Sequence, residues 1–293
     1  MNILITGCNG QLGTWMRRLS ALHTSHHFVF TDIVAMDAET QVLDITDAAA
    51  VQSFIQEQAI ELIVNCAAYT NVDKAEEDEP TARCINAQAV EVLGSAISPV
   101  TQMPCRVIHI STDYVFAGDE HLPCREQDAV APRTAYGRTK LEGEQRLIQV
   151  NPQAIIFRTA WLYSEFGNNF VKTMLRLSSE HELLRVVYDQ IGTPTYARDL
   201  AELIYTAIES AQWHAGIYHF TDEGVCSWYD FTVEILRQTG SSCHVEPILS
   251  SEYRYRTPRP HYSVLDKAKV KAIFGITIPY WSDSLRVCLA GLK

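Results

Sequence analysis

The chain begins with Met1-Asn-Ile-Leu-Ile-Thr-Gly-Cys-Asn-Gly-Gln-Leu-Gly13, and this stretch decides the fold. The residues before Gly7 form a short apolar run long enough for one buried strand, and a glycine turn with Gly7, Gly10 and Gly13 follows at once. Leu12, Met16 and Leu19 then recur at helical spacing. Glycines in such a turn let the backbone approach a pyrophosphate, which is held by the amides and the dipole of the helix start. The stretch therefore predicts the strand, turn and helix of a dinucleotide-binding fold.

The same alternation continues through the first half of the chain. The apolar run 28–31 predicts a second strand, which ends at Asp32, an acidic residue at the distance expected for binding an adenosine ribose. Asp47 is expected to cap a helix at 48–58, and strands at 62–65 and 106–110 flank a further helix at 81–97. Repeated β-α-β units with right-handed crossovers predict a doubly wound parallel α/β sheet, the Rossmann architecture.

Beyond the middle of the chain the alternation becomes irregular. A helix containing Tyr136 is expected to end near Val150, and a fifth strand is expected at 154–157. Further helices are predicted at 168–178, 197–210 and 227–238, with a strand at 217–220. We therefore expect a dinucleotide-binding domain at 1–160, with returns to the sheet around 197–220. Residues 161–293 are expected to form mainly a smaller, interleaved substrate-binding domain.

Composition narrows the class of protein. The 293 residues are 47% hydrophobic and 20% charged, which is ordinary for a soluble globular protein. No apolar run has membrane-spanning length and no secretory signal is evident, so we expect a cytoplasmic protein without a membrane partner. The eight scattered cysteines form no Cys-x-x-Cys pair, which disfavours disulfides and structural zinc. A net charge of −11 disfavours binding to nucleic acid.

Two groups of polar residues predict chemistry at the sheet edge. Ser111-Thr112-Asp113-Tyr114 follows the predicted strand 106–110, and ligands of open α/β sheets bind at the carboxyl ends of the strands. Tyr136 and Lys140 are four residues apart, which places them on one face of a helix. An ammonium beside a phenol favours the phenolate, so we expect Lys140 to lower the pKa of Tyr136. Tyr136 is then a candidate proton donor to a carbonyl that is being reduced.

Taken together, these motifs resemble the extended short-chain dehydrogenase/reductase family. Within it, the chain is similar to the members that reduce dTDP-4-dehydrorhamnose. The matching segments run almost from end to end: Asn65-Cys-Ala-Ala-Tyr-Thr70, Val72-Asp-Lys-Ala-Glu76, Ser111-Thr-Asp-Tyr-Val-Phe116, Tyr136-Gly-Arg-Thr-Lys140, Arg158-Thr-Ala-Trp161, Gly167-Asn-Asn-Phe170, Asp189-Gln-Ile-Gly-Thr-Pro-Thr195 and Arg259-Pro260.

The resemblance implies an NADPH- or NADH-dependent reduction of the C4 ketone of dTDP-4-dehydrorhamnose to dTDP-L-rhamnose, with a dTDP-sugar as the partner. Thr112, Tyr136 and Lys140 are the implied catalytic residues. The implied cofactor-binding residues are Gly7, Gly10, Gln11, Leu12 and Gly13 at the pyrophosphate, Asp32 at the adenosine ribose, Asp44 and Ile45 at adenine, and Ala68, Tyr69, Thr70, Tyr136 and Lys140 along the nicotinamide half. The implied substrate-binding residues are Thr112, Asp113, Trp161, Asn169 and Arg259.

Cofactor choice, metal and oligomeric state are less determined by the residues. Asp32 ordinarily disfavours the 2′-phosphate of NADPH, whereas members of the family use NADPH and often NADH, so dual use is expected. Some members are dimers linked by Mg²⁺ through glutamates, one of them in the first helix. Here that region reads Trp15-Met-Arg17, which argues against a Mg²⁺ site and leaves a homodimer open.

Two alternatives stay open at this point. One is a noncatalytic, NADP-binding regulatory subunit of a methionine adenosyltransferase-like enzyme, which the retention of Thr112, Tyr136 and Lys140 disfavours. Another is a different nucleotide-sugar ketoreductase or epimerase. Dehydratases of this fold usually carry Asp-Glu after the threonine, where this chain has Asp113-Tyr114.

A cationic cluster near the end of the chain also has two interpretations. It is either a solvated surface or a phosphate clamp, and its members are Arg254, Arg256, Arg259 and Lys267.

Overall fold

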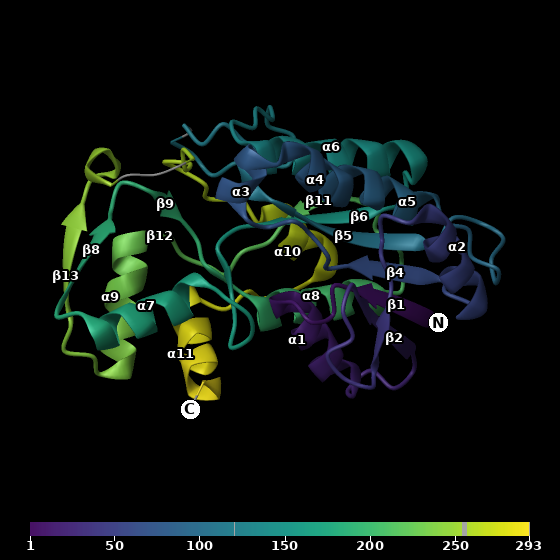
Figure 1. Cartoon of the computed structure of the whole chain (residues 1–293), viewed down its shortest axis with the longest axis horizontal. Helices are drawn as coiled ribbons and strands as arrows, with labels where there is room; N and C mark the ends of the chain where they lie inside the picture. The colour runs from purple at the N-terminus through teal and green to yellow at the C-terminus, as the bar shows by residue number, and fades with distance from the viewer. Residues whose placement is uncertain (120, 254–256, 293) are drawn as a thin grey trace.

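The computed structural model describes residues 1–119, 121–253 and 257–292. Within them, seven parallel strands form a central sheet in the order β11-β6-β5-β4-β1-β2-β3 (Figure 1). Their bounds are β1 (Asn2–Thr6), β2 (His27–Asp32), β3 (Thr40–Val42), β4 (Leu62–Asn65), β5 (Arg106–Thr112), β6 (Ile155–Thr159) and β11 (Gly216–His219). The strand order reverses between β1 and β4, which places a ligand crevice at their carboxyl ends. The predicted doubly wound sheet is confirmed.

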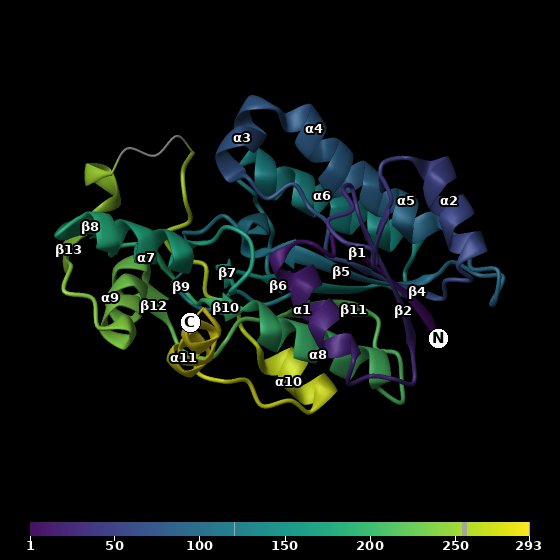
Figure 2. The same ribbon diagram turned by 60° about the horizontal axis from the view of Figure 1, so that its bottom comes forward.

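Helices cover both faces of this sheet, as Figures 1 and 2 show. One face is covered by α1 (Gln11–Ser20), α8 (Ala197–Glu209) and α10 (Ala268–Phe274). The other carries α2 (Ala48–Glu57), α5 (Ala89–Ser95) and α6 (Ala135–Val150), with α3 (Val72–Glu77) and α4 (Glu79–Arg83) packed on α6. Ile3, Leu4 and Ile5 of β1 are fully buried because the sheet is covered on both sides.

Local sequence signals explain where several helices begin. The Asp47 carboxylate accepts hydrogen bonds from the amides of Ala49 and Ala50, so it caps α2 as predicted. The predicted helix 81–97 is instead three pieces, because α4 begins at Glu79, a π-helical turn spans Cys84–Gln88, and α5 ends at Ser95. Ala96 is extended, and Ile97 pairs with Pro104, which ends the helix earlier than the apolar periodicity suggested.

A second, smaller lobe lies at one end of the sheet, on the left in Figure 1. It contains α7 (Phe170–Glu180), α9 (Trp228–Thr239), α11 (Trp281–Gly291) and the parallel pair of β8 (Leu183–Val187) with β13 (His244–Ile248). Short pairs join it to the rest: β7 (Leu162–Tyr163) with β10 (Thr195–Tyr196), and β9 (Ile191–Gly192) with β12 (Cys226–Ser227). Ser227 caps α9 as predicted, and its hydroxyl and the Asp230 carboxylate form a capping box.

The chain crosses between the two lobes more than once. After β6 it enters the small lobe, and it returns to the sheet with α8 and β11, within the predicted return at 197–220. It then leaves again for α9 and β13, and returns with α10, which packs against α8 and β11. The division into 1–160 and 161–293 remains our proposal for the domains.

Candidate active site

A cavity of about 1130 Å³ follows the carboxyl ends of the central strands. Polar and small residues after β1, β2, β4, β5 and β6 line it together with the start of α6. Most of the predicted site residues lie on this wall: Gly7, Gly10, Gln11, Leu12, Asp32, Asp44, Ile45, Ala68, Thr70, Thr112, Asp113, Trp161, Tyr136 and Lys140. The fold therefore brings together residues that are up to about half the chain apart.

The glycine turn has the shape that a pyrophosphate requires. Gly7 has a φ of +64°, and a Cβ there would lie 2.6 Å from the Ala67 amide nitrogen. A Cβ on Gly13 would lie 2.2 Å from the Gly7 carbonyl oxygen, so Gly13 serves the packing of α1 on the turn. Gly10 precedes α1, and no side chain caps the helix there. The free amides of the first turn thus fit a phosphate anion.

The acidic residues at the far end of this cavity are already hydrogen-bonded. The Asp32 carboxylate accepts from the amides of Asn9, at 3.0 Å, and Ile33, at 2.8 Å. Asp44 accepts from the amide of Thr46 at 2.9 Å and from its hydroxyl at 2.7 Å. Both carboxylates are held in place by the backbone beside them, which fixes the edge of the site where a ribose and an adenine are expected.

Four predicted site residues do not line this cavity. Gly13 packs as described, and the backbone of Tyr69 is held by the Asn86 amide, which accepts from its N–H at 2.9 Å and donates to its carbonyl at 3.1 Å. Asn169 caps α7 and donates from Nδ2 to Oε1 of Gln11 at 3.0 Å. Asn169 thus contacts a cavity residue rather than the cavity itself. The fourth, Arg259, lines a second cavity.

Tyr136 stands where the cavity reaches the end of β5. Burial raises the pKa of its phenol to about 12, a hydrogen bond with Thr112 opposes this, and the charge of Asp113 adds to it. The Tyr136 ring also contacts Tyr114 edge-to-face, with 5.5 Å between ring centroids. A phenol with a raised pKa keeps its proton at neutral pH, as a proton donor must.

Thr112 and Asp113 form a hydrogen-bonded pair beside that phenol. The Thr112 hydroxyl donates to Oδ1 of Asp113 at 2.9 Å and accepts from the Tyr114 amide at 3.2 Å. Asp113 is buried, which raises its pKa to about 6, while hydrogen bonds with Thr112 and Ser263 oppose the shift. Its other oxygen, Oδ2, is buried and has no hydrogen-bond partner among the described residues.

Lys140 is buried one helical turn after Tyr136. Its Nζ donates to the Ile110 carbonyl at 2.6 Å and lies 3.3 Å from Nε2 of His109. Burial lowers the Lys140 pKa to about 8, and the charge of Glu144 opposes this. The expected lowering of the Tyr136 pKa is not found in the free chain, because burial is the largest influence on this phenol and raises its pKa. Nζ of Lys140 is instead directed to the Ile110 carbonyl.

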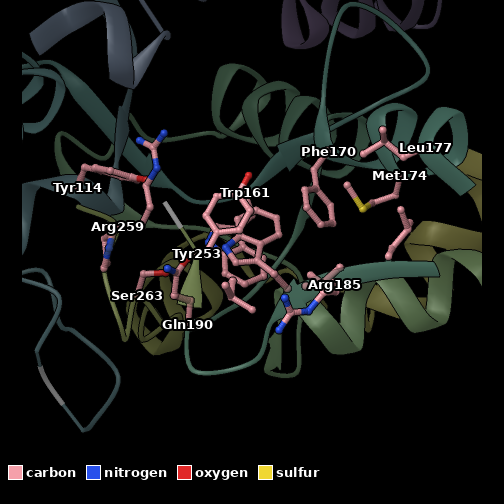
Figure 3. A pocket seen from close by; sticks show the side chains of 15 residues that line it. Tyr114, Trp161, Phe170, Met174, Leu177, Arg185, Gln190, Tyr253, Arg259 and Ser263 are labelled. Carbon is pink, nitrogen blue, oxygen red and sulfur yellow. The ribbon is translucent and has the colours of Figure 1, made fainter. Parts of the chain in front are cut away.

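A second cavity of about 320 Å³ adjoins the first, and we call it the aromatic cavity because five aromatic side chains line it together with aliphatic and polar residues (Figure 3). The rings of Trp161 and Trp228 stack with centroids 3.5 Å apart, and Phe170 lies 4.4 Å from Trp228. Trp161 and Tyr114 line both cavities. Sequence reasoning missed Trp228 and Phe170 as site residues. The sequence signal for Trp228 was its position directly after the helix cap Ser227. A tryptophan at such a position is also typical of the core.

The predicted cationic cluster is divided by the structure. Arg259 lines the second cavity and pairs with Asp73 at 2.9 Å between Nη2 and Oδ2. Lys267 instead donates to the Asp222 carbonyl at 3.0 Å and pairs with Glu223 at 3.4 Å. The predicted Arg254 and Arg256 lie outside the described residues. Of the two cations of this cluster that the structure places, Arg259 is therefore the one that still fits a phosphate clamp.

Two further expectations concern groups other than the dinucleotide. In the part of the chain that the structure describes, no cluster of three or more His, Cys, Asp or Glu side chains is placed to hold a metal ion. No helix among those residues combines the length and the apolar character needed to cross a bilayer.

The glycine turn, the reversed strand order and the grouping of Thr112, Tyr136 and Lys140 define a Rossmann-fold oxidoreductase of the short-chain dehydrogenase/reductase type. Comparison with known proteins specifies the family. The model of the RmlD substrate binding domain matches residues 1–293, and the chain belongs to this family.

Individual relatives agree with that assignment. The chain is 37% identical to a dTDP-4-dehydrorhamnose reductase of Aggregatibacter actinomycetemcomitans, over 97% of each protein. Among solved structures, it is similar to a dTDP-4-dehydrorhamnose reductase of Clostridium acetobutylicum, with 42% identity, a TM-score of 0.91 and coverage of 100% and 99%. The Bacillus anthracis reductase in complex with NADP has 34% identity, a TM-score of 0.88 and coverage of 100% and 99%.

Proposed function

We propose that this chain is an NAD(P)H-dependent dTDP-4-dehydrorhamnose reductase, which reduces the C4 ketone of dTDP-4-dehydro-6-deoxy-L-mannose to give dTDP-L-rhamnose. One observation carries the proposal. Tyr136 and Thr112 lie where the large cavity meets the aromatic one, and Tyr114 and Trp161 belong to both walls. A carbonyl placed at this junction is reached from one side by a cofactor and from the other by a nucleotide.

The large cavity suits the cofactor. The uncapped start of α1 at Gly10 would hold the pyrophosphate, and Asp32 the adenosine ribose. Lys140 and the strip at Ala68 and Thr70 would hold the nicotinamide half. When bound, the reduced nicotinamide supplies a hydride to the ketone carbon. Asp32 favours NADH, while the family includes an NADP complex, so we propose that both cofactors are used.

Side chains of the protein donate the proton to the ketone oxygen and stabilise the charges that form. As negative charge develops on the ketone oxygen, the Tyr136 hydroxyl donates its proton there, which breaks one O–H bond and forms another. The Thr112 hydroxyl turns toward the same oxygen and stabilises the charge by a hydrogen bond. A charged Lys140 one turn away stabilises the phenolate that Tyr136 becomes.

The aromatic cavity suits the nucleotide part of the substrate. The stacked Trp161 and Trp228 with Phe170 offer flat apolar faces for a pyrimidine base. Arg185 and Arg259 are cations on the same wall that fit the two phosphates. Binding the nucleotide here positions the sugar ring at the junction, which supplies the orientation that the reaction needs.

Turnover is the direct test of this function. Oxidation of NADPH and NADH is followed by absorbance with freshly made dTDP-4-dehydrorhamnose, and the product is identified by mass spectrometry and NMR. We expect turnover with both cofactors and a product identical to dTDP-L-rhamnose. A folded, cofactor-binding chain without turnover would contradict the proposal. Co-purification of a stoichiometric enzyme partner in that case would favour the regulatory-subunit alternative, and turnover of a different ketosugar would favour a related reductase.

Compartment and assembly are further parts of the proposal. We propose that the chain works in the cytoplasm, because its eight cysteines are free thiols, as expected in a reducing compartment. A homodimer is proposed from the family resemblance. Light scattering at working concentrations measures the mass, and a monomer under turnover conditions would contradict the dimer.

A further inference from the structure

A buried row of polar groups lies beneath the reacting residues. It runs from Asn65 at the end of β4, through His109 on β5, to Lys140 on α6. These three side chains are 1%, 0% and 2% exposed, so each hydrogen bond in the row must be made within the protein. The mechanism proposed above uses Lys140 but gives no role to the other two.

The direction of the first hydrogen bond follows from a backbone group. The Ala67 N–H, which is always a donor, lies 3.2 Å from Oδ1 of Asn65. The Thr6 hydroxyl donates to the same oxygen at 2.7 Å. The Asn65 amide is therefore oriented with its oxygen toward Ala67 and its Nδ2 toward His109. That Nδ2 lies 3.1 Å from Nδ1 of His109, to which it donates.

This orientation determines where the His109 ring carries its proton. Burial lowers the pKa of His109 well below its ordinary value, and the charge of Lys140 lowers it further, so the ring is uncharged at neutral pH. An uncharged imidazole has one N–H, and Nδ1 is occupied as an acceptor. The proton is consequently on Nε2, the nitrogen that lies 3.3 Å from Nζ of Lys140.

An N–H directed at Nζ has a consequence for the charge of Lys140. An ammonium has three N–H donors and no lone pair, so it cannot accept the hydrogen bond from His109. The uncharged amine has a lone pair for His109 and still donates to the Ile110 carbonyl at 2.6 Å. We propose that His109 is a positioning residue whose Nε2–H donates to Lys140, so that Lys140 loses its proton at a lower pH than burial alone would set.

The other charged groups near Lys140 do not replace this effect. Glu144, on the same helix, favours the ammonium. Its carboxylate is also neutralised by Arg158 on β6, through bonds of 2.9 and 2.6 Å. Asp113, beyond β5, accepts from Thr112. Cys66, after β4, stays an uncharged thiol because burial raises its pKa. Two uncharged groups in the described part of the chain lie within hydrogen-bond distance of Nζ, the Ile110 carbonyl and His109. The carbonyl accepts from either form of Lys140, so His109 is the one that disfavours the ammonium.

The inference rests on the proposed function for its catalytic meaning, because the reaction needs a charged Lys140 beside the phenolate of Tyr136. Activity is then full below the pKa of Lys140 and is lost as the pH rises through it, which places the alkaline limit of the reaction near the Lys140 pKa of about 8. His109 sets this limit without touching substrate.

The first test compares pH profiles of kcat/KM. His109→Leu fills a similar volume without an N–H, and we expect the alkaline limit to move up by about one pH unit, the equivalent of one hydrogen bond. The matched control is His219→Leu, a fully buried histidine at the end of β11. Its profile should keep the limit of the unaltered chain. An unmoved limit in His109→Leu would overturn the proposal.

The second test needs no turnover, so it separates failure of this inference from failure of the proposed function. Nitrogen-15 NMR of the histidine-labelled chain shows which ring nitrogen of His109 carries the proton, and we expect Nε2. Carbon-13 NMR of labelled lysine follows the titration of Lys140, which should move to higher pH in His109→Leu. A proton on Nδ1, or an unchanged Lys140 titration, would refute the role of His109 even in an active enzyme.

Discussion

The two cavities of this protein are built in different ways. The large one is made from backbone amides and short polar side chains that follow the strands of the central sheet. The small one combines aromatic side chains on α7, α9 and the segment after β6 with aliphatic side chains on α7 and β8. The sheet therefore positions the groups that react, whereas packing between distant segments shapes the pocket for the nucleotide. We therefore expect substitutions at the sheet to change chemistry, stability or cofactor choice, and substitutions in the small cavity to change recognition of the substrate.

Removing the proton donor should have the largest effect. Tyr136→Phe keeps the ring that packs on Tyr114 but deletes the hydroxyl, so kcat should fall about 100- to 10,000-fold. Binding of NADPH, measured by calorimetry, should stay near that of the unaltered chain. Turnover close to normal would mean that another group donates the proton.

Breaking the buried ion pair should damage the sheet lobe. Arg158 and Glu144 are 3% and 2% exposed, and Arg158→Ala leaves an unpaired carboxylate in the core. We expect the free energy of unfolding in urea to fall by about 3–5 kcal/mol. The double variant Glu144→Leu, Arg158→Met should recover most of this, because no buried charge then lacks a partner. A single variant as stable as the parent would show that water reaches Glu144.

Removing an aromatic ring from the second cavity should weaken binding of the nucleotide sugar but not binding of the cofactor. Trp228→Ala removes one of the two stacked rings, so KM for the nucleotide sugar should rise about 10- to 100-fold. KM for NADPH should stay unchanged, since Trp228 does not line the large cavity. Trp213→Ala is the matched control, because Trp213 packs on the sheet lobe. Equal changes in KM for NADPH and in KM for the nucleotide sugar would show that the two cavities do not bind cofactor and substrate separately.

Removing the negative charge of Asp32, where the adenosine ribose is expected, should have the smallest effect. Asp32→Asn loses the negative charge and keeps one of the two oxygens that accept from the amides of Asn9 and Ile33. The ratio of kcat/KM for NADPH to that for NADH should rise by roughly 10-fold, because a 2′-phosphate no longer faces a carboxylate. The measurement is steady-state kinetics with each cofactor. An unchanged ratio would place the selectivity elsewhere on the cavity wall.

The sheet lobe could be predicted because its signals are local. An apolar run, the glycine turn and the cap Asp47 each act within a few residues, and all lie where the sequence indicates. The cap Ser227 of α9 in the small lobe is local in the same way. Strand ends then bring Thr112 and Asp113 to the same edge as Tyr136, as the rule for parallel sheets predicts. Family membership was predicted as well, because the matching segments cover most of the chain.

The small lobe could not be predicted in the same way. β8 and β13 are short, partly exposed and about 60 residues apart, and Pro247 within β13 argues against a strand. Their pairing is decided by tertiary contacts rather than by local propensity. The pKa of Tyr136 was missed for a related reason. Helical spacing places Lys140 beside it, but burial and the partners of Nζ decide which effect is larger.

Trp161 has a φ of +49°, a left-handed conformation that is rare for a bulky residue, and it lies in the wall between the two cavities. A residue in a shared wall can couple the two occupants. If one ligand changes the position of Trp161, the affinity for the other changes by some factor, and the reverse influence must have the same factor. Movement of the strained Trp161 would in that case couple binding of the cofactor to binding of the sugar nucleotide.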